Sequence, residues 1–174
     1  LHEPYRRQRQ MCIRDRCGRT TIFEDPLRLG RRGTELLPTL LETHTPDAVV
    51  LMLGTNDCKT IFGASAEIIG KGIARLLEQI NQYADKMKVL VISPIYLGEK
   101  VWQDGYDQEF SPESVEVSKK LEPVYEKVAG KYGKRFMRAA DYASPSEADQ
   151  EHMDGQSHKI LADAIYRKLE AEIL

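Results

Sequence analysis

The sequence predicts an α/β fold in which a parallel sheet is covered by helices on both faces. Two short runs, residues 48–53 and 88–93, are mainly apolar, which is typical of strands buried on both faces. Segments with apolar residues spaced three and four apart lie between and after these runs, which is typical of amphipathic helices. Because strands and helices alternate along the chain, parallel strands are favoured.

The individual elements follow from local patterns. Strands are predicted at residues 48–53, 88–93 and 135–140. Helices are predicted at residues 34–43, 65–84, 111–132 and 156–173. Thr34 and Ser65 are expected to act as N-caps, and Pro112 fits the first turn of its helix, whereas Pro123 predicts a kink. The long loop at residues 94–110 is either functional or a cover for the edge of the core.

Composition restricts the class of protein. With 174 residues, 41% of them hydrophobic and 30% charged, the chain is expected to form one globular domain with its own core. A net charge of -2 does not indicate nucleic acid or an anionic membrane as a partner. No apolar run reaches the roughly 20 residues needed to span a bilayer, and the N-terminus has no secretory pattern. Three cysteines without a framework spacing favour a reducing, cytoplasmic setting.

Residues 1–16 differ from the rest of the chain. They have no helical or strand period and contain five arginines. They could be a basic arm for nucleic acid or a disordered terminus. They also resemble translated sequencing-adapter sequence from the broken end of a gene, which is the interpretation adopted here. The predicted organisation is therefore a foreign N-terminal segment, residues 1–16, followed by a single domain, residues 17–174.

The first candidate for chemistry follows the strand at residues 48–53. That strand ends in Gly54-Thr55-Asn56-Asp57, and ligands bind at the carboxyl ends of strands in open α/β sheets. The amide group of Asn56 can donate a hydrogen bond to an oxyanion. The alternative is that Asn56 and Asp57 only form a turn, which both residue types favour.

The second candidate is the pair Asp149 and His152, which lie three residues apart in a polar loop. If the loop turns back, the carboxylate takes the proton on one ring nitrogen and leaves the other as a base. The alternatives are a solvated loop or a metal site that would also use Asp154 and His158. No spacing here matches a zinc motif such as H-E-x-x-H.

Taken together, the two candidate stretches resemble the SGNH hydrolases, also called GDSL-type esterases or lipases, and within them the arylesterase and acyltransferase branch. The matching blocks run in the family's order from Cys17 to the C-terminus. They are Gly18-Arg19-Thr20-Thr21, Asp25-Pro26, residues 36–41 (LLPTLL), 51–57 (LMLGTND), 62–65 (FGAS), 91–94 (VISP) and 149–152 (DQEH).

The resemblance implies a three-layer α/β/α flavodoxin-like fold and a serine esterase, or an acyltransferase, that works through an acyl-enzyme. His152 would be the general base and then the acid, and Asp149 would orient it. Asn56 and the backbone N–H of Gly18 would donate to the oxyanion. A small-molecule ester would be the substrate, without metal or other cofactor, and a homo-oligomer would agree with this branch.

One departure from the family pattern is large. The family's nucleophile lies in a Gly-Asp-Ser block at the end of the first strand, and this chain has no such block. All eight of its serines have other neighbours: Ser65, Ser93, Ser111, Ser114, Ser118, Ser144, Ser146 and Ser157. We therefore expect the first strand and first helix to be missing, with the junction at Arg16/Cys17, and the fragment to be inactive. The non-catalytic alternative is a flavodoxin-like binding module.

Overall fold

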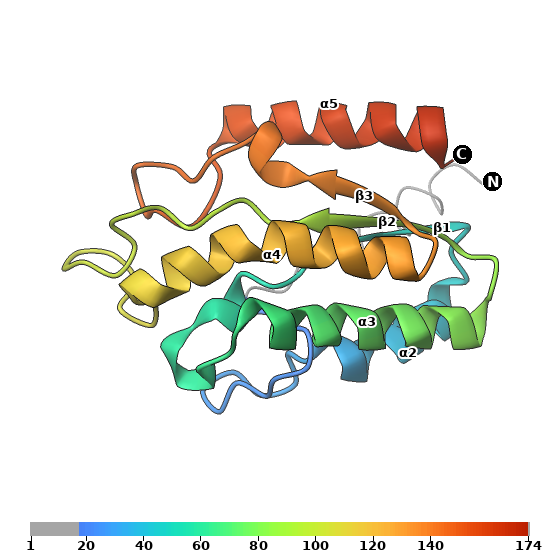
Figure 1. Ribbon diagram of the computed structural model, residues 1–174, viewed down its shortest axis with the longest axis horizontal. Helices are drawn as coiled ribbons and strands as arrows, with labels where there is room; N and C mark the ends of the chain where they lie inside the picture. The colour runs from blue at the N-terminus through green and yellow to red at the C-terminus, as the bar shows by residue number, and fades with distance from the viewer. Residues whose placement is uncertain (1–17, 174) are drawn as a thin grey trace.

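The computed structural model describes residues 18–173, which form a parallel sheet between two helical layers (Figure 1). The predicted foreign segment at residues 1–16, together with Cys17 and Leu174, lies outside the described residues. Its separation from the domain therefore stays a prediction.

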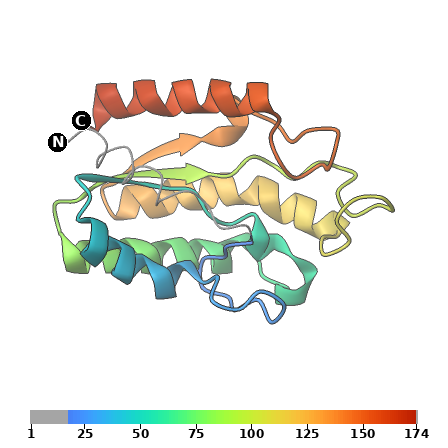
Figure 2. The ribbon, with the colours of Figure 1, turned by 180° about the vertical axis from the view of Figure 1, so that it is seen from behind.

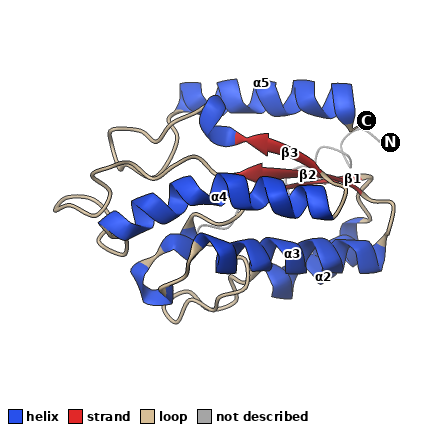
Figure 3. Ribbon diagram, viewed as in Figure 1, coloured by secondary structure: helices blue, strands red, loops and turns tan. Residues whose placement is uncertain are grey.

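The sheet has three strands in the order β1-β2-β3, and both pairs are parallel. The strands are β1 (Ala48–Leu51), β2 (Lys88–Ser93) and β3 (Arg135–Arg138). The arrows of β2 and β3 point the same way in Figure 3, and β1 runs parallel to β2, so the carboxyl ends of all three strands meet at one edge of the sheet. The loops at that edge can bring residues from distant parts of the sequence together.

Helices cover both faces of the sheet (Figure 2). One face carries α2 (Gly33–His44), α3 (Ala66–Tyr83) and α4 (Pro112–Lys131), and the other carries α5 (Gly155–Glu172). The larger core packs β1 and β2 against the three-helix layer, and the smaller core packs β2 and β3 against α5. The predicted α/β fold, a parallel sheet flanked by helices, is confirmed.

Several predicted helix starts agree with the capping contacts. The Ser65 side chain accepts a hydrogen bond from the N–H of Ile68 at the start of α3. Ser111 and Ser114 form a reciprocal capping box at the start of α4, and α4 continues through Pro123. These serines satisfy N–H groups that have no partner within the helix.

Other predicted boundaries were wrong. Thr34 is not an N-cap, because α2 begins one residue earlier and its N-cap is Arg32, without a side-chain bond. The third strand ends at Arg138, and the short helix η3 (Ala139–Asp141) follows. The first strand ends at Leu51 rather than residue 53, and Val50 is 41% exposed, so this strand is not buried on both faces. Within residues 18–173, β1 pairs only with β2 and is an edge strand.

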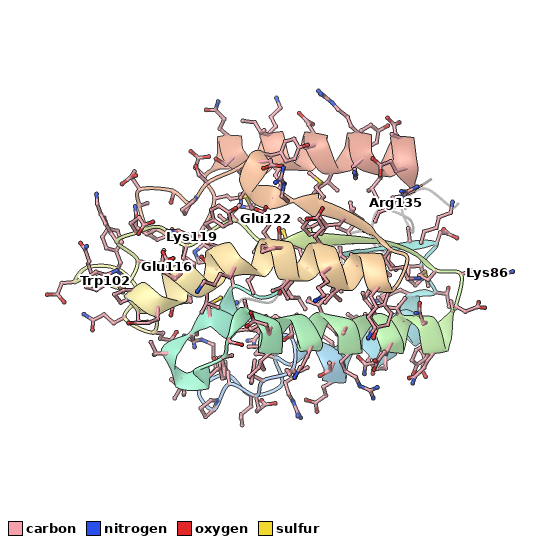
Figure 4. The ribbon with its side chains drawn as sticks, in the orientation of Figure 1. Lys86, Trp102, Glu116, Lys119, Glu122 and Arg135 are labelled. Carbon is pink, nitrogen blue, oxygen red and sulfur yellow. The ribbon has the colours of Figure 1, made fainter. Side chains whose placement is uncertain are left out.

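The outer face of α4 carries charged residues that include Glu116, Lys119 and Glu122 (Figure 4). The Lys119 ammonium lies 2.7 Å from the Glu99 carboxylate and 2.9 Å from that of Glu116. The first of these contacts connects α4 to the predicted long loop at residues 94–110. None of the helices in the described residues has both the length and the apolar character needed to cross a membrane.

Candidate active site

A cavity of about 350 Å³ opens at the carboxyl edge of the sheet. Its walls come from the segments that follow β1 and β2 and from the loop before α5, at the end of the sheet where the loops gather (Figure 3). Three of the four predicted site residues, Gly18, Asn56 and His152, line this cavity. The fourth, Asp149, contacts His152. The structure therefore brings together all four side chains or backbone groups singled out in the sequence.

His152 and Asp149 form a hydrogen-bonded pair. The Nδ1 atom of His152 lies 2.9 Å from Oδ2 of Asp149. The other carboxylate oxygen, Oδ1, accepts hydrogen bonds from the backbone N–H groups of Glu151 and His152, at 3.0 and 2.8 Å. An ionised carboxylate can only accept, so Nδ1 of a neutral ring carries the proton and Nε2 is left as the basic nitrogen.

The carboxylate of Asp149 stays ionised in this setting. Burial opposes its ionisation, but the hydrogen bonds from Glu151 and His152 outweigh burial and hold the pKa of Asp149 below its usual value. An Asp149 carboxylate that is charged at neutral pH holds the imidazole in one tautomer and stabilises its protonated form.

Asn56 and Gly18 line the cavity from segments that come before β2 in the chain. Asn56 is the first residue of the short helix η1 (Asn56–Cys58), and its Nδ2 donates to the backbone oxygen of Arg19 at 3.3 Å. An amide nitrogen carries two hydrogens, so this bond leaves one for another acceptor. Gly18 has a φ of +77°, and a Cβ there would lie 2.9 Å from Cδ of Arg28. The positive φ therefore favours glycine, and a side chain here would also displace Arg28.

Asp57 and Thr21 join the segments that carry Asn56 and Gly18. Asp57 is fully buried, and its carboxylate accepts from the Thr21 N–H at 2.9 and 3.0 Å and from the Thr21 hydroxyl. Burial raises the pKa of Asp57 to about 6, although the bonds from Thr21 oppose the shift. In the sequence, a turn was the alternative role for Asp57, and a buried bond was not predicted. No local pattern could reveal its partner 36 residues away.

A second unpredicted network surrounds Glu109. Its carboxylate accepts from the Arg28 guanidinium at 3.0 and 2.9 Å and from the Lys59 ammonium at 2.6 Å. These bonds lower the pKa of Glu109 to about 2, and Arg28 also bonds Asp25 at 3.0 Å. Arg28 and Lys59 both line the cavity, but Asp25 and Glu109 balance their charges.

Two further carboxylates, Glu151 and Asp107, also line the cavity. The side chain of Glu151 is only 13% exposed, and its Oε2 lies 3.8 Å from Nδ1 of His152. Burial raises the pKa of Glu151. The cavity wall beside His152 is thus rich in hydrogen-bond acceptors.

The family model that matches the chain is the GDSL-like lipase/acylhydrolase family, and the match covers residues 5–159. This chain belongs to that family. The predicted family assignment is therefore confirmed. No curated protein matches the chain.

Solved structures agree with this assignment. Est24, a carbohydrate acetylesterase from Sinorhizobium meliloti, is 32% identical with a TM-score of 0.81, and the match covers 88% of this chain and 74% of that one. The native aryl esterase of M. smegmatis is 27% identical with a TM-score of 0.79, covering 90% and 75%. A lipase/acylhydrolase from Enterococcus faecalis is 17% identical with a TM-score of 0.62, covering 90% and 73%, and shows a likeness of fold alone.

The serines of this GDSL-like chain all lie within the described residues, and none of them lines the cavity. Several stabilise local structure, including the caps Ser65, Ser111 and Ser114. Ser146 is bonded to the pair through Asp149, because its hydroxyl donates to Oδ1 of that residue at 3.3 Å. The structure does not contradict the expectation that this chain lacks its nucleophile.

The alternative metal site finds no support in the same region. The side chain of Asp154 accepts from the N–H of Ser157 at 2.7 Å, so it caps α5. In the part of the chain from residue 18 to 173, no group of three or more His, Cys, Asp or Glu side chains is close enough to hold a metal ion.

Proposed function

We propose that this GDSL-like acylhydrolase, when completed by a nucleophilic serine that the 174 residues do not supply, cleaves small acyl esters through an acyl-enzyme intermediate. The observation that carries the proposal is the Asp149–His152 pair, bonded at 2.9 Å, whose imidazole lines the same cavity as Asn56 and Gly18. A base, the carboxylate that orients it, and donors suited to an oxyanion are the parts that acyl transfer to a serine needs.

The proposed reaction follows from these roles. Nε2 of His152 takes the proton from the attacking serine hydroxyl while Asp149 holds the ring and stabilises its positive charge. The Asn56 amide and the Gly18 N–H donate to the oxyanion of the tetrahedral intermediate. His152 then returns the proton to the leaving alcohol. Water, or a second alcohol in an acyl transfer, releases the acyl group from the serine.

We propose that the serine belongs to a Gly-Asp-Ser strand that pairs with the open edge of β1. In the described residues β1 has one neighbour, and Val50 and Met52 are 41% and 38% exposed beside that edge. Met52 also lines the cavity. A parallel strand added at this edge would end beside the cavity, where the carboxyl ends of β1 and β2 already lie.

The alcohol part of the substrate is proposed to be polar. Arg28, Lys59, Asp107 and Glu151 line the cavity beside apolar residues that include Met52, Ile95 and Met153, and no Phe, Tyr or Trp side chain lies among the described lining residues. Such walls bond hydroxyl groups better than they pack an aryl ring. The similarity to a carbohydrate acetylesterase agrees with this choice. In an enzyme carrying the restored serine block, kcat/KM for an acetylated sugar should exceed that for phenyl acetate.

The decisive experiment measures hydrolysis of a p-nitrophenyl ester by four proteins. The 174-residue chain should show no turnover above the buffer rate, because removal of a nucleophile costs on the order of 10⁶ in turnover in a serine protease. The same chain with a Gly-Asp-Ser strand and its following helix fused before residue 18 should be active. His152→Ala in that fusion should abolish activity, and the serine→Ala fusion is the matched control. Turnover by the 174-residue chain that survives a serine-directed fluorophosphonate would overturn the proposal.

A further inference from the structure

Gln150 bonds the loop that carries Asp149 and His152 to the loop after β2. The backbone N–H of Gly98 donates to the backbone oxygen of Gln150 at 2.7 Å. The Gln150 side chain is almost fully buried, with 5% of the residue exposed. Its Oε1 accepts from the N–H of Lys100 at 3.4 Å, and its Nε2 donates to Glu147 at 3.1 Å. Gln150 therefore bonds the loop after β2 through both its backbone oxygen and its side chain, and its side chain also bonds Glu147 in its own loop.

The backbone of Gln150 is strained. Its φ is +62°, a left-handed conformation that glycine adopts without cost and that glutamine rarely adopts. A strained residue of this kind persists only where its surroundings hold it in place. Here the surroundings are supplied by Gly98, whose missing side chain makes room for Gln150. A Cβ at position 98 would lie 2.3 Å from Oε1 and 2.8 Å from Cβ of Gln150.

The strained turn shapes the Asp149–His152 pair. Gln150 lies between Asp149 and the two N–H groups, those of Glu151 and His152, that donate to Asp149 Oδ1. These bonds form only if the chain reverses at position 150. The Gln150 N–H donates to Ser146 O at 2.9 Å, and the Ser146 N–H donates to His152 O at 2.7 Å, which closes the turn.

We propose that Gln150, seated against Gly98, is a positioning residue that fixes the Asp149–His152 pair and thereby the Nδ1-protonated tautomer of His152. It touches neither ring nor substrate and acts through Asp149. The inference rests on the roles proposed above for that pair, but its test requires no esterase activity. The competing explanation is that Gln150 merely tolerates its strain and that the backbone bonds alone hold the pair.

Gln150→Gly separates the two explanations. Glycine removes the strain and keeps every backbone bond, so it should leave the pair intact if the backbone alone is sufficient. If the seated side chain positions the pair, the same change should release it. Gly98→Ala tests the contact from the other side. Its added methyl group collides with Gln150, while the amino-acid sequence of residues 146–152 stays that of the wild type.

The measurement is the tautomer of His152 in the 174-residue chain, read from the ¹⁵N shifts of labelled imidazoles at a pH where the ring is neutral. The His152 signals are assigned by their loss in His152→Ala. The wild-type ring should be mainly Nδ1-protonated, and Gln150→Gly and Gly98→Ala should each at least halve that excess. Gly130→Ala, where a Cβ meets nothing within 4 Å, is the matched control and should change nothing.

The double variant Gly98→Ala/Gln150→Gly adds a coupling test. Once the Gln150 side chain is gone, the new methyl group has nothing to displace, so the double variant should behave like Gln150→Gly alone. A wild-type tautomer in Gln150→Gly would overturn the proposal, even if Gly98→Ala fails to fold. A wild-type ring with no tautomer preference would overturn this proposal together with the role of Asp149. An inactive restored enzyme with the expected tautomers would contradict the proposed function alone.

Discussion

The wall of the cavity that carries Asn56 and Gly18 is held by bonds between residues far apart in sequence, whereas the Asp149–His152 bond of the His152 wall lies within one short loop. Thr21 and Asp57 are 36 residues apart, and Arg28 and Glu109 are 81 apart. Asp149 and His152 are three apart. The first set is buried or partly buried, and the side chain of His152 is 64% exposed.

Because of this difference, we expect the residues of the Asn56 wall to determine the stability of the site and the Asp149–His152 pair to determine its chemistry. Substitutions on the Asn56 wall remove buried bonds or create steric overlap, so they should lower the free energy of unfolding. Substitutions at the exposed pair should leave that free energy nearly unchanged and act on proton transfer alone. The four substitutions below test this division, in order of decreasing expected effect.

Gly54→Ala should have the largest effect. A Cβ at this position would lie 2.2 Å from the Oη atom of Tyr125, and Gly54 has a φ of +130°. Tyr125 is fully buried and donates to Leu53 O at 2.8 Å, so it has no room to move. We expect a loss of about 3–5 kcal/mol in urea unfolding. Gly130→Ala in α4 is the control and should be neutral or stabilising, and a loss below about 1 kcal/mol at Gly54 would contradict the stated geometry.

Asp57→Asn should change how stability depends on pH. The folded-state pKa of Asp57, about 6, lies above its usual value of 3.8, so the folded protein binds the proton more tightly than the unfolded chain. The stabilisation from the protonated form is complete below pH 3.8 and is lost as the pH rises through about 6. The full change is about 3 kcal/mol, at 1.36 kcal/mol per pH unit.

Urea unfolding of wild type and Asp57→Asn between pH 3.5 and about 7.5 checks this prediction. Asparagine does not titrate, so the free energy of unfolding of Asp57→Asn should increase relative to that of wild type as the pH rises through this range. A constant difference between the two proteins would mean that Asp57 does not have the raised pKa.

Glu109→Gln should have an intermediate effect. The substitution leaves Arg28 and the buried Lys59 without their shared carboxylate, but Glu109 is 28% exposed and partly screened. We expect a loss of about 2 kcal/mol at pH 7. Because the pKa of Glu109 falls from 4.5 to about 2 on folding, its stabilisation is present above pH 4.5 and is lost as the pH falls towards 2. Wild type and variant should therefore converge in acid, which thermal melts at several pH values would show.

His152→Ala should have the smallest effect on stability. The ring is mostly exposed, and it contacts Asp149 and Glu151 within the same loop. The free energy of unfolding should change by less than about 0.5 kcal/mol. The same substitution should abolish activity in the restored enzyme. A loss above about 2 kcal/mol would place His152 with the structural residues and remove the contrast between the two walls.

The same contrast explains what the sequence could reveal. The buried strand β2 and the helix α3 were predictable because a local apolar pattern and a Ser65 cap define them. The contact between Asp149 and His152 was predictable because it spans one turn of loop. The bonds of Asp57 and Glu109 were not, since their partners are distant and no periodicity marks them. The end of β1 was misjudged because its apolar run continues past Leu51 into the cavity wall.

The Glu109 network also determines when the segment around Lys59 can fold during synthesis of the chain. Lys59 leaves the ribosome 50 residues before Glu109, which is a delay of roughly 2–10 s at about 5–20 residues per second. During that interval the ammonium group of Lys59, whose side chain is only 4% exposed in the folded protein, cannot yet pair with the Glu109 carboxylate. Burying it then would be costly, so the nascent segment around Lys59 should stay open until Glu109 emerges. The Asn56 wall would thus be a late product of translation, closed by a residue encoded almost two thirds of the way along the chain.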